Sequence, residues 1–310
     1  MATFFGTEIN DFQNTGWSVL HGAGGDDFLV SDQPGPVSIY GGAGMDFMYS
    51  TNAMSTADIH GGDGNDTIIG HYPDDALYGD EGNDVIAGAD FYYPDPGGQI
   101  TPYDPSGNDL IEGGAGQDAL YGLDGNDVIR GGDGDDWGTI FAPTHTFWST
   151  GETFTVQAGL FGGDGDDRLY GDAGSDLLVG GDGNDKQYGG TGDDVLYAGH
   201  GADKNHGGDG ADTFAFDYVW ESQKGRGRDV IKDFSKADHD AIGLYWMDAN
   251  LNKNGDQAFD FIGDEAFHHR SGELRFDKHL LSGDTDGDGR ADFVVKVAGV
   301  KSLHDHDFYL

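Results

Sequence analysis

Apolar residues recur along most of the chain at a spacing of nine positions, each in the middle of a three-residue segment. Side chains alternate between the two faces of a strand, so this pattern predicts short strands with one inward side chain each. Six residues rich in glycine separate one strand from the next. The predicted inward positions are Ile68, Leu77, Ile86, Ile111, Leu120, Ile129, Leu169, Leu178, Leu196 and Phe214.

The glycine-rich segments predict tight turns, because glycine at their first, second and fourth positions adopts the backbone angles that such turns require. Two nine-residue units make one coil, so residues 18 apart stack in one sheet. A nonapeptide of the form Gly-Gly-x-Gly-x-Asp-x-apolar-x is typical of a calcium-binding parallel β-roll. We therefore predict an all-β solenoid. The longest unbroken run of turns begins at Gly162, Gly171, Gly180, Gly189, Ala198 and Gly207.

Aspartate occupies the sixth position of nearly every turn. Stacking would bring these carboxylates and several turn carbonyls around shared gaps, and calcium prefers roughly six to eight oxygen ligands. The predicted ligands at position six are Asp26, Asp46, Asp66, Asp84, Asp109, Asp118, Asp127, Asp136, Asp167, Asp176, Asp185, Asp194, Asp203 and Asp212. Further candidates at positions three and one are Asp63, Asp133, Asp164, Asp182, Asp209, Gly61, Gly113, Gly131, Gly162, Gly171, Gly180, Gly189 and Gly207.

The first 60 residues follow a longer period, with consensus turns twenty residues apart. We predict irregular coils of one nine-residue turn and one eleven-residue half over residues 1–60. These turns begin at His21, Gly41 and Gly61, and the inward candidates before them are Val19, Ile39 and Ile59.

Residues 61–215 are predicted to form the regular roll, interrupted by insertions at 89–103 and 137–161. The turn at 70–75 keeps the register but has lost three glycines, which weakens its calcium half-site. Long loops on a rigid scaffold often carry function. The insertion aromatics serve either as a platform for a partner or as small satellite cores, and they are Phe91, Tyr92, Tyr93, Tyr103, Trp137, Phe141, Phe147, Trp148 and Phe154.

Residues 216–310 contain less glycine and more aromatic residues than the repeats. A solenoid needs an end cap that covers its last open layer, so we predict a β-rich C-terminal cap. Just before it, Gln187 and Asn205 take inward positions 18 residues apart. Buried amides must be hydrogen-bonded, so we expect an amide ladder or a water-filled interior there.

The 310 residues carry a formal net charge of −41, with 57 acidic against 16 basic residues. The acids recur at one phase of the repeat, which fits a ligand array. Their excess over basic residues disfavours nucleic acid as a partner, and it disfavours an anionic membrane unless calcium bridges the two. No apolar run is long enough to span a bilayer, and the first residues lack the features of a cleaved signal peptide. Cysteine is absent, so bound metal rather than disulfides would stabilise the fold.

The nonapeptides over residues 6–215 resemble those of RTX proteins, which type I (ABC transporter) systems export. The C-terminal third is similar to the C-terminal domain of serralysin-type metalloproteases in five motifs, at 208–216, 229–234, 248–250 with 255–263, 272–275 and 283–293. This resemblance implies a domain that folds with calcium and carries an uncleaved secretion signal. In that family the signal often ends as Asp307-Phe-Tyr-Leu310 does here.

The chain departs from serralysins in its chemistry, because no His-Glu pair occurs anywhere in it. The zinc motif of that family requires two histidines and a glutamate at helical spacing. His268, His269, His304 and His306 are interpreted as surface residues. The protease activity is therefore not carried over, and we predict no enzyme.

An acidic segment in the predicted cap matches the start of an EF-hand loop. Position twelve of that loop should be glutamate but is Val295. The segment is either a small calcium site in a β-turn or only an acidic turn. Its candidate ligands are Asp284, Asp286, Asp288 and Asp292.

These observations predict a secreted, extracellular or cell-surface protein that binds multiple Ca²⁺ ions, folds on calcium after type I export, and acts in adhesion or assembly. Two alternatives stay open. One is an extracellular glycan-binding module that uses the insertions, and the other is a secretion and calcium module associated with an enzyme encoded elsewhere. The expected partners are calcium, the ABC exporter, and cell-surface polysaccharide or further copies of the chain.

Overall fold

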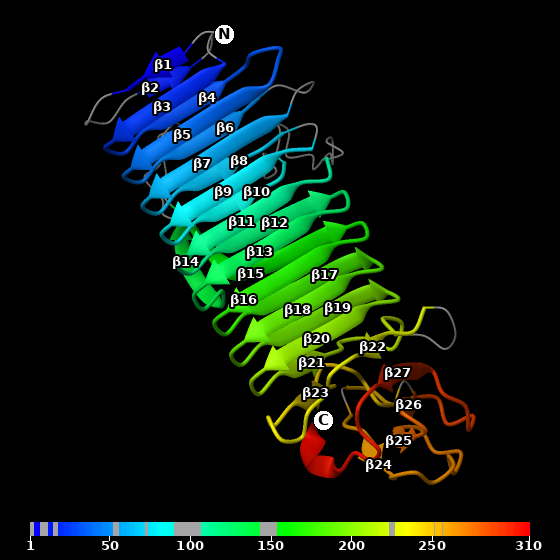
Figure 1. The fold of residues 1–310 in the computed structure, drawn as a ribbon. Coiled ribbons are helices and arrows are strands. Elements are labelled where there is room, and N and C mark those ends of the chain that lie inside the picture. Colours follow the sequence, from blue (N-terminus) through cyan, green and yellow to red (C-terminus); the bar gives the residue numbers. More distant parts are fainter. Residues whose placement is uncertain are drawn as a thin grey trace. The chain divides into compact units, whose positions relative to one another are not determined.

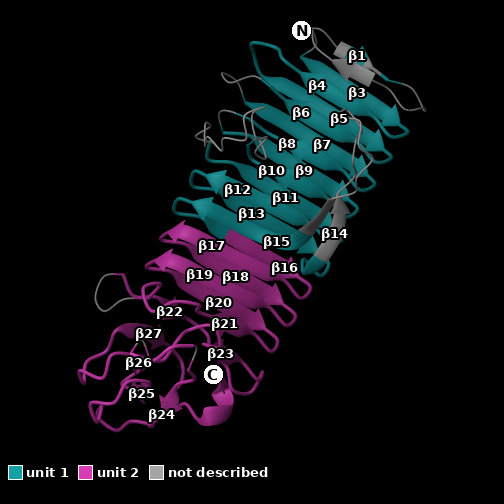
Figure 2. Ribbon diagram, turned by 180° about the vertical axis from the view of Figure 1, so that it is seen from behind, with its two compact units in different colours: residues 1–168 teal, residues 169–310 magenta. Residues whose placement is uncertain are grey.

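The structure is a computed structural model, and almost all its regular elements are β-strands. It describes residues 3–6, 12–14, 18–51, 56–71, 74–89, 107–142, 154–222, 227–250, 252–255 and 257–310. Helix among the described residues is limited to one 3-10 turn, η1 (Asp305–Asp307), and none is long and apolar enough to cross a membrane. The chain divides into two compact units, residues 1–168 and 169–310 (Figure 2). The division at 215/216 stays a prediction.

Unit 1 contains two parallel sheets that take alternate strands of the chain, so two strands make one coil (Figure 1). Sheet 1 has the order β1 (Thr3–Phe5), β3 (Val19–Gly24), β5 (Val37–Ala43), β7 (Ala57–Asp63), β9 (Ala76–Glu81), β11 (Leu110–Ala115) and β13 (Val128–Asp133). Sheet 2 has the order β2 (Phe12–Asn14), β4 (Phe28–Ser31), β6 (Phe47–Ser50), β8 (Thr67–Ile69), β10 (Val85–Ala87), β12 (Ala119–Asp124) and β15 (Phe154–Asp164).

Unit 2 begins with the same alternation and ends in a mixed region. Its sheet 3 contains β16 (Arg168–Ala173), β18 (Lys186–Thr191), β20 (Lys204–Asp209), β22 (Val230–Ile231), β27 (Phe293–Val297), β26 (Leu280–Asp284), β25 (Glu273–Asp277) and β24 (Asp260–Phe261), in that order. Its sheet 4 contains β17 (Leu177–Gly183), β19 (Val195–Gly201), β21 (Thr213–Ala215), β23 (Ala241–Gly243) and β28 (Phe308–Tyr309). Strands β25, β26 and β27 pair antiparallel. The predicted all-β roll is confirmed.

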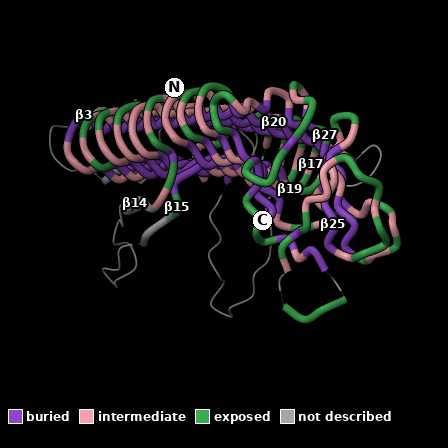
Figure 3. The backbone as a smooth tube through the Cα atoms, turned by 90° about the horizontal axis from the view of Figure 1, so that it is seen from below, coloured by how far each residue is buried: buried purple, intermediate pink, exposed green. Residues whose placement is uncertain are grey.

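The core is a single file of inward side chains along each sheet, and Figure 3 shows the buried stretches along the strands. Ile59 pairs in register with Leu77, and Leu77 with Ile111. All the inward positions predicted from the nine-residue period are fully buried. Each of these strands contributes one apolar side chain to the interior, which explains the regular nine-residue spacing of the apolar positions.

In the first coil the register differs by one residue from the prediction. Leu20, not Val19, is fully buried and pairs with Ile39. The first turn therefore begins at Gly22 rather than His21, and the next follows 19 residues later at Gly41.

The insertions leave the stacking of the coils intact. Strand β10 pairs with β12, and β9 with β11, across the first insertion. The two ends of the second insertion pair with each other, since β14 (Gly138–Ala142) lies antiparallel to β15. The predicted aromatics at 91–93, 103, 147 and 148 lie outside the described residues.

Candidate calcium-binding site

The position-six aspartates form columns of hydrogen-bonded carboxylates along the edges of the sheets. In each step, the backbone N–H of one aspartate donates to Oδ1 of the aspartate one coil further on, as from Asp66 to Asp84 at 2.7 Å. Unit 1 has one column of Asp27, Asp46, Asp66, Asp84, Asp118 and Asp136, and a second of Asp75, Asp109, Asp127 and Asp167. Unit 2 has columns of Asp176, Asp194, Asp212 and Asp240, and of Asp185, Asp203 and Asp229.

The second oxygen of these carboxylates is buried and receives no hydrogen bond in much of the array. The aspartates themselves are almost completely buried. A buried anionic oxygen without a donor or a cation is strongly unfavourable. Oxygens of this kind are Oδ2 of Asp46, Asp66, Asp84, Asp109, Asp118, Asp127, Asp194 and Asp212.

Glycine at position one lets a carboxylate and a carbonyl from the next coil approach the same point. A Cβ added at Gly61 would lie 2.3 Å from Asp66 Oδ2 and 2.5 Å from the carbonyl oxygen of Gly79. The same arrangement recurs around Gly113 with Asp118 and the Gly131 carbonyl. Any larger residue would fill the space between these oxygens. Like Gly131, several other predicted glycines present their own carbonyl oxygen to the position-one glycine of the preceding coil. They are Gly61, Gly113, Gly162, Gly189 and Gly207.

Burial raises the pKa of the column carboxylates. Desolvation, followed by the charges of neighbouring aspartates, raises the pKa of Asp84 and of Asp109 to about 8. Desolvation likewise raises the pKa of Asp66 and of Asp118 to about 7. The backbone hydrogen bond to Oδ1 works in the opposite direction and is outweighed. These carboxylates therefore keep their protons up to near-neutral pH, and a bound cation would favour their charged form.

The structure separates the sequence-predicted site residues into two groups. Every predicted position-six aspartate from Asp46 to Asp212 lies in a column. The predicted position-three aspartates are all exposed to solvent, and they are Asp63, Asp133, Asp164, Asp182 and Asp209. Gly171 and Gly180 are position-one glycines of unit 2, where an added Cβ would meet Oδ2 of Asp176 and Asp185 respectively.

Asp26 occupies a different place from the one predicted. Asp27 takes position six of the first turn and donates its N–H to Asp46 Oδ1 at 2.7 Å. Asp26 stands at position five, where its Oδ1 accepts the N–H of Met45. It belongs to an outer ladder in which asparagines also take part, since Asn65 Oδ1 accepts the N–H of Asn83. Two adjacent aspartates made the register ambiguous in the sequence.

Sequence reasoning left the half-site of Asp75 in doubt, whereas the structure places Asp75 in a column; it missed Asp229 and Asp240. The last two lie outside any glycine-rich turn, but each precedes a strand by the same offset as the repeats, with Ile231 and Ile242 fully buried. The N–H of Asp229 donates to Ser222 Oγ at 2.9 Å, and Asp240 Oδ2 accepts the N–H of Ser235 at 2.7 Å. These contacts end the two columns of unit 2 without a further aspartate.

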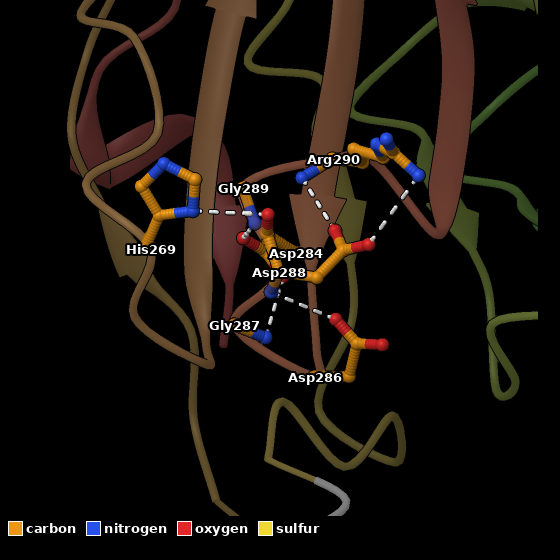
Figure 4. Close-up of polar contacts among 7 residues, drawn as sticks. All are labelled: His269, Asp284, Asp286, Gly287, Asp288, Gly289 and Arg290. Carbon is orange, nitrogen blue, oxygen red and sulfur yellow. Dashed lines mark hydrogen bonds and ion pairs between the residues drawn. The ribbon is translucent and has the colours of Figure 1, made fainter.

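The acidic loop between β26 and β27 is built differently (Figure 4). Asp284 is buried, but its two oxygens accept the N–H groups of Gly287 and Gly289 at 2.7 and 2.8 Å. Oxygens of Asp284, Asp286 and Asp292 lie within 4.8 Å of one another, and Asp288 is not part of this group. Because the backbone already satisfies Asp284, a calcium ion at this loop stays a prediction.

Four segments of the chain match a family model, that of the RTX calcium-binding nonapeptide repeat. They are residues 58–93, 106–137, 160–187 and 188–214. These segments are RTX repeats. RTX repeats bind calcium ions at multiple sites, and the segments contain most of the column aspartates. The predicted RTX resemblance is thereby confirmed.

Two solved structures are similar to parts of the chain. The AlgE6R3 subunit of the Azotobacter vinelandii mannuronan C5-epimerase is 26% identical over 47% of this chain and 78% of its own, with a TM-score of 0.33. The extracellular lipase LipA of Serratia marcescens is 20% identical over 82% of this chain and 40% of its own, with a TM-score of 0.27. Among curated proteins, no sequence matches this chain.

The column geometry fits the calcium that RTX repeats bind. The available donors are carboxylate and carbonyl oxygens, the ligand type that calcium prefers over softer metals. The buried Oδ2 atoms without a hydrogen-bond donor identify where positive charge is required. The RTX turns are therefore the calcium-binding part of this protein.

Proposed function

We propose that this protein is secreted, folds as calcium fills its carboxylate columns, and serves outside the cell as a non-enzymatic structural or adhesive protein. The observation that carries the proposal is the recurrence along the columns of buried carboxylate oxygens without hydrogen-bond donors, as at Oδ2 of Asp66, Asp84 and Asp118. Calcium supplies positive charge and oxygen coordination to these groups when it binds. Column aspartates and position-one carbonyls would hold it.

Calcium-coupled folding supports export in an unfolded state. In a calcium-poor cytosol the columns would bury like charges side by side, which favours the unfolded chain. An unfolded chain can pass through a one-step ABC exporter. Extracellular calcium at about millimolar concentration lies in the range in which extracellular modules bind it, so folding would follow export.

The first test is a calcium titration of the full chain, followed by circular dichroism, on a matched pair of variants from one turn. Asp66→Asn removes the charge from a column carboxylate, whereas Asp63→Asn changes an exposed position-three side chain. We expect Asp66→Asn to raise the calcium concentration at the folding midpoint by roughly three- to tenfold, because site charge tunes calcium affinity. Asp63→Asn should leave the midpoint near that of the unaltered protein.

A chain that is fully ordered in excess chelator at neutral pH would overturn the coupling. Equal midpoints for the two variants would show that the columns are not the ligands. The extracellular role is tested by expressing the chain with and without an ABC exporter and following it to the medium, the cell surface or the cytosol. Retention inside exporter-positive cells would contradict the secretion part of the proposal.

A second candidate function is binding of neutral glycans, and one surface of unit 2 favours it. The carboxyl ends of three neighbouring strands of sheet 4, namely β21, β23 and β28, are each followed by or end in exposed aromatic residues. Parallel strands present these ends at the same edge. Sugar rings pack on exposed aromatic faces, and the acidic surroundings disfavour anionic polymers. The exposed aromatics are Tyr218, Trp220, Tyr245, Trp246 and Tyr309.

The glycan function is tested on a glycan array with single tryptophan variants of the calcium-loaded protein. Trp246→Ala, at a side chain that is 63% exposed, should abolish binding if the edge of sheet 4 is the platform. Trp137→Ala, at the start of the second insertion, is the matched control at 45% exposure. Loss of binding only in Trp137→Ala would return the platform to the insertion, and no binding at all would remove this candidate.

A further inference from the structure

A second kind of metal-ligand set lies at the C-terminal end of unit 2, apart from the carboxylate columns. Nitrogen atoms of His304 and His306 and an oxygen of Asp307 all lie within 4.8 Å of one another. These residues form and flank η1, which leads directly into β28. The Asp307 side chain is only 4% exposed, so this carboxylate is a fixed, buried group.

An ammonium group already occupies the point at which two of these ligands converge. Lys236 Nζ lies 2.7 Å from Asp307 Oδ2 and 2.8 Å from His304 Nδ1. A lysine ammonium can only donate hydrogen bonds, so His304 Nδ1 accepts and its lone pair points at a positive charge. On the other side of the carboxylate, His306 Nε2 lies 3.5 Å from Asp307 Oδ1.

The two imidazole rings are arranged to act together. His304 and His306 stack with a ring-centroid distance of 5.4 Å and an interplanar angle of 5°. Asp307 also accepts the backbone N–H of His304 at 2.7 Å, which fixes the carboxylate relative to the ring. Two imidazoles with one carboxylate suit zinc, copper, nickel or cobalt, whereas calcium is bound by oxygen ligands alone.

We propose that His304, His306 and Asp307 bind a divalent transition-metal ion, which takes the place of the Lys236 ammonium. The Lys236 side chain is 31% exposed and can turn into solvent when the ion binds. The ion would release the turn that contains Lys236 from the segment that enters β28, because Lys236 would lose its contacts with His304 and Asp307. This site shares no ligand with the calcium columns, so it is independent of the proposed calcium-coupled folding.

Cobalt(II) added to the calcium-saturated full chain tests the site, because its visible absorption reports nitrogen ligands directly. We expect one cobalt ion per chain with bands of mixed nitrogen and oxygen ligation. His306→Gln, at a side chain that is 77% exposed, should weaken binding by at least about tenfold. His268→Gln is the matched control, since His268 also lies beside a carboxylate, that of Glu273, but outside this cluster.

Lys236→Met gives a second, opposite readout. Removal of the competing ammonium should tighten cobalt binding by about tenfold, an effect that unspecific binding to surface histidines would not produce. Circular dichroism in calcium establishes that each variant is folded. Displacement of cobalt by millimolar calcium, equal loss in His306→Gln and His268→Gln, or weaker binding in Lys236→Met would each overturn the proposal.

Discussion

Two glycines of the regular turn are favoured for different physical reasons. Gly61 has no room for a Cβ because the Asp66 carboxylate and the Gly79 carbonyl occupy that space. Gly64 has a φ of +139°, where side-chain-bearing residues are strained, and a Cβ there would lie 1.7 Å from the Gly44 carbonyl oxygen. Position two is more tolerant, since Leu123 and Asp172 adopt φ values of 78° and 72° there.

We therefore predict that Gly64→Ala lowers the free energy of unfolding in calcium by about 3 kcal/mol or more, from backbone strain and the carbonyl clash. Gly35→Ala is the control, because nothing lies within 4 Å of an added Cβ and its φ is not positive. Urea denaturation of both variants in saturating calcium measures the difference. Equal stability of the two variants would contradict the steric account of the turn.

Asn205 is a second residue whose environment makes a sharp prediction. Its side chain is fully buried, and neither Nδ2 nor Oδ1 has a hydrogen-bond partner among the described residues. Asn205→Leu should raise the free energy of unfolding by about 1 kcal/mol, because it removes unsatisfied polar atoms. Gln187→Leu should gain less, since Gln187 Nε2 donates to the Tyr197 carbonyl at 2.8 Å. Destabilisation by Asn205→Leu would instead indicate a buried water bonded to the amide.

The carboxylate columns are the part of the candidate site that the sequence predicts best. The nine-residue period was enough to predict the inward side chains and most column members, because each coil repeats one local geometry. It could not predict Asp229 and Asp240, which take the same place without the glycine turn that signals it. The choice between Asp26 and Asp27 depended on the 19-residue coil, which is set by packing of Leu20 on Ile39.

The columns predict a characteristic pH dependence of the chain in chelator. Burial raises the pKa of column aspartates from about 4 in the unfolded chain to between about 6, as for Asp46, and about 8, as for Asp194. The folded state then binds more protons than the unfolded state, so its stability is fully present below about pH 4 and is lost as the pH rises towards 8. Each unit of pKa shift is worth about 1.4 kcal/mol for one carboxylate.

Circular dichroism in chelator at pH 8 and pH 5 measures this effect, and we expect the chain to be more ordered at the lower pH. Calcium-saturated protein is the control and should show the opposite trend, because protons compete with calcium for the carboxylates. A chain whose stability in chelator rises with pH would show that the columns are not buried in the way described.

At the scale of the whole molecule, charge dominates. A net charge of −41 in a chain with buried carboxylates opposes compaction, and calcium binding offsets that charge where it is most concentrated. Fold class and the ligand type followed from the repeat alone. The ends of the columns in unit 2 did not, because Asp229 and Asp240 lack the glycine-rich turn. The contacts of Lys236 with His304 and Asp307 did not either, because these residues lie far apart in sequence.

Specific calcium ligation and general screening of the acidic charge should respond differently to the choice of salt. Magnesium requires near-octahedral geometry and keeps several of its waters, which the buried columns are not expected to accommodate. Small-angle X-ray scattering in chelator should give a radius of gyration of about 60 Å, as for an unfolded chain of this length. Calcium should reduce it sharply, whereas magnesium at the same concentration, or sodium chloride at the same ionic strength, should not. Compaction by all three salts would mean that screening of the acidic chain, rather than occupancy of the columns, drives folding.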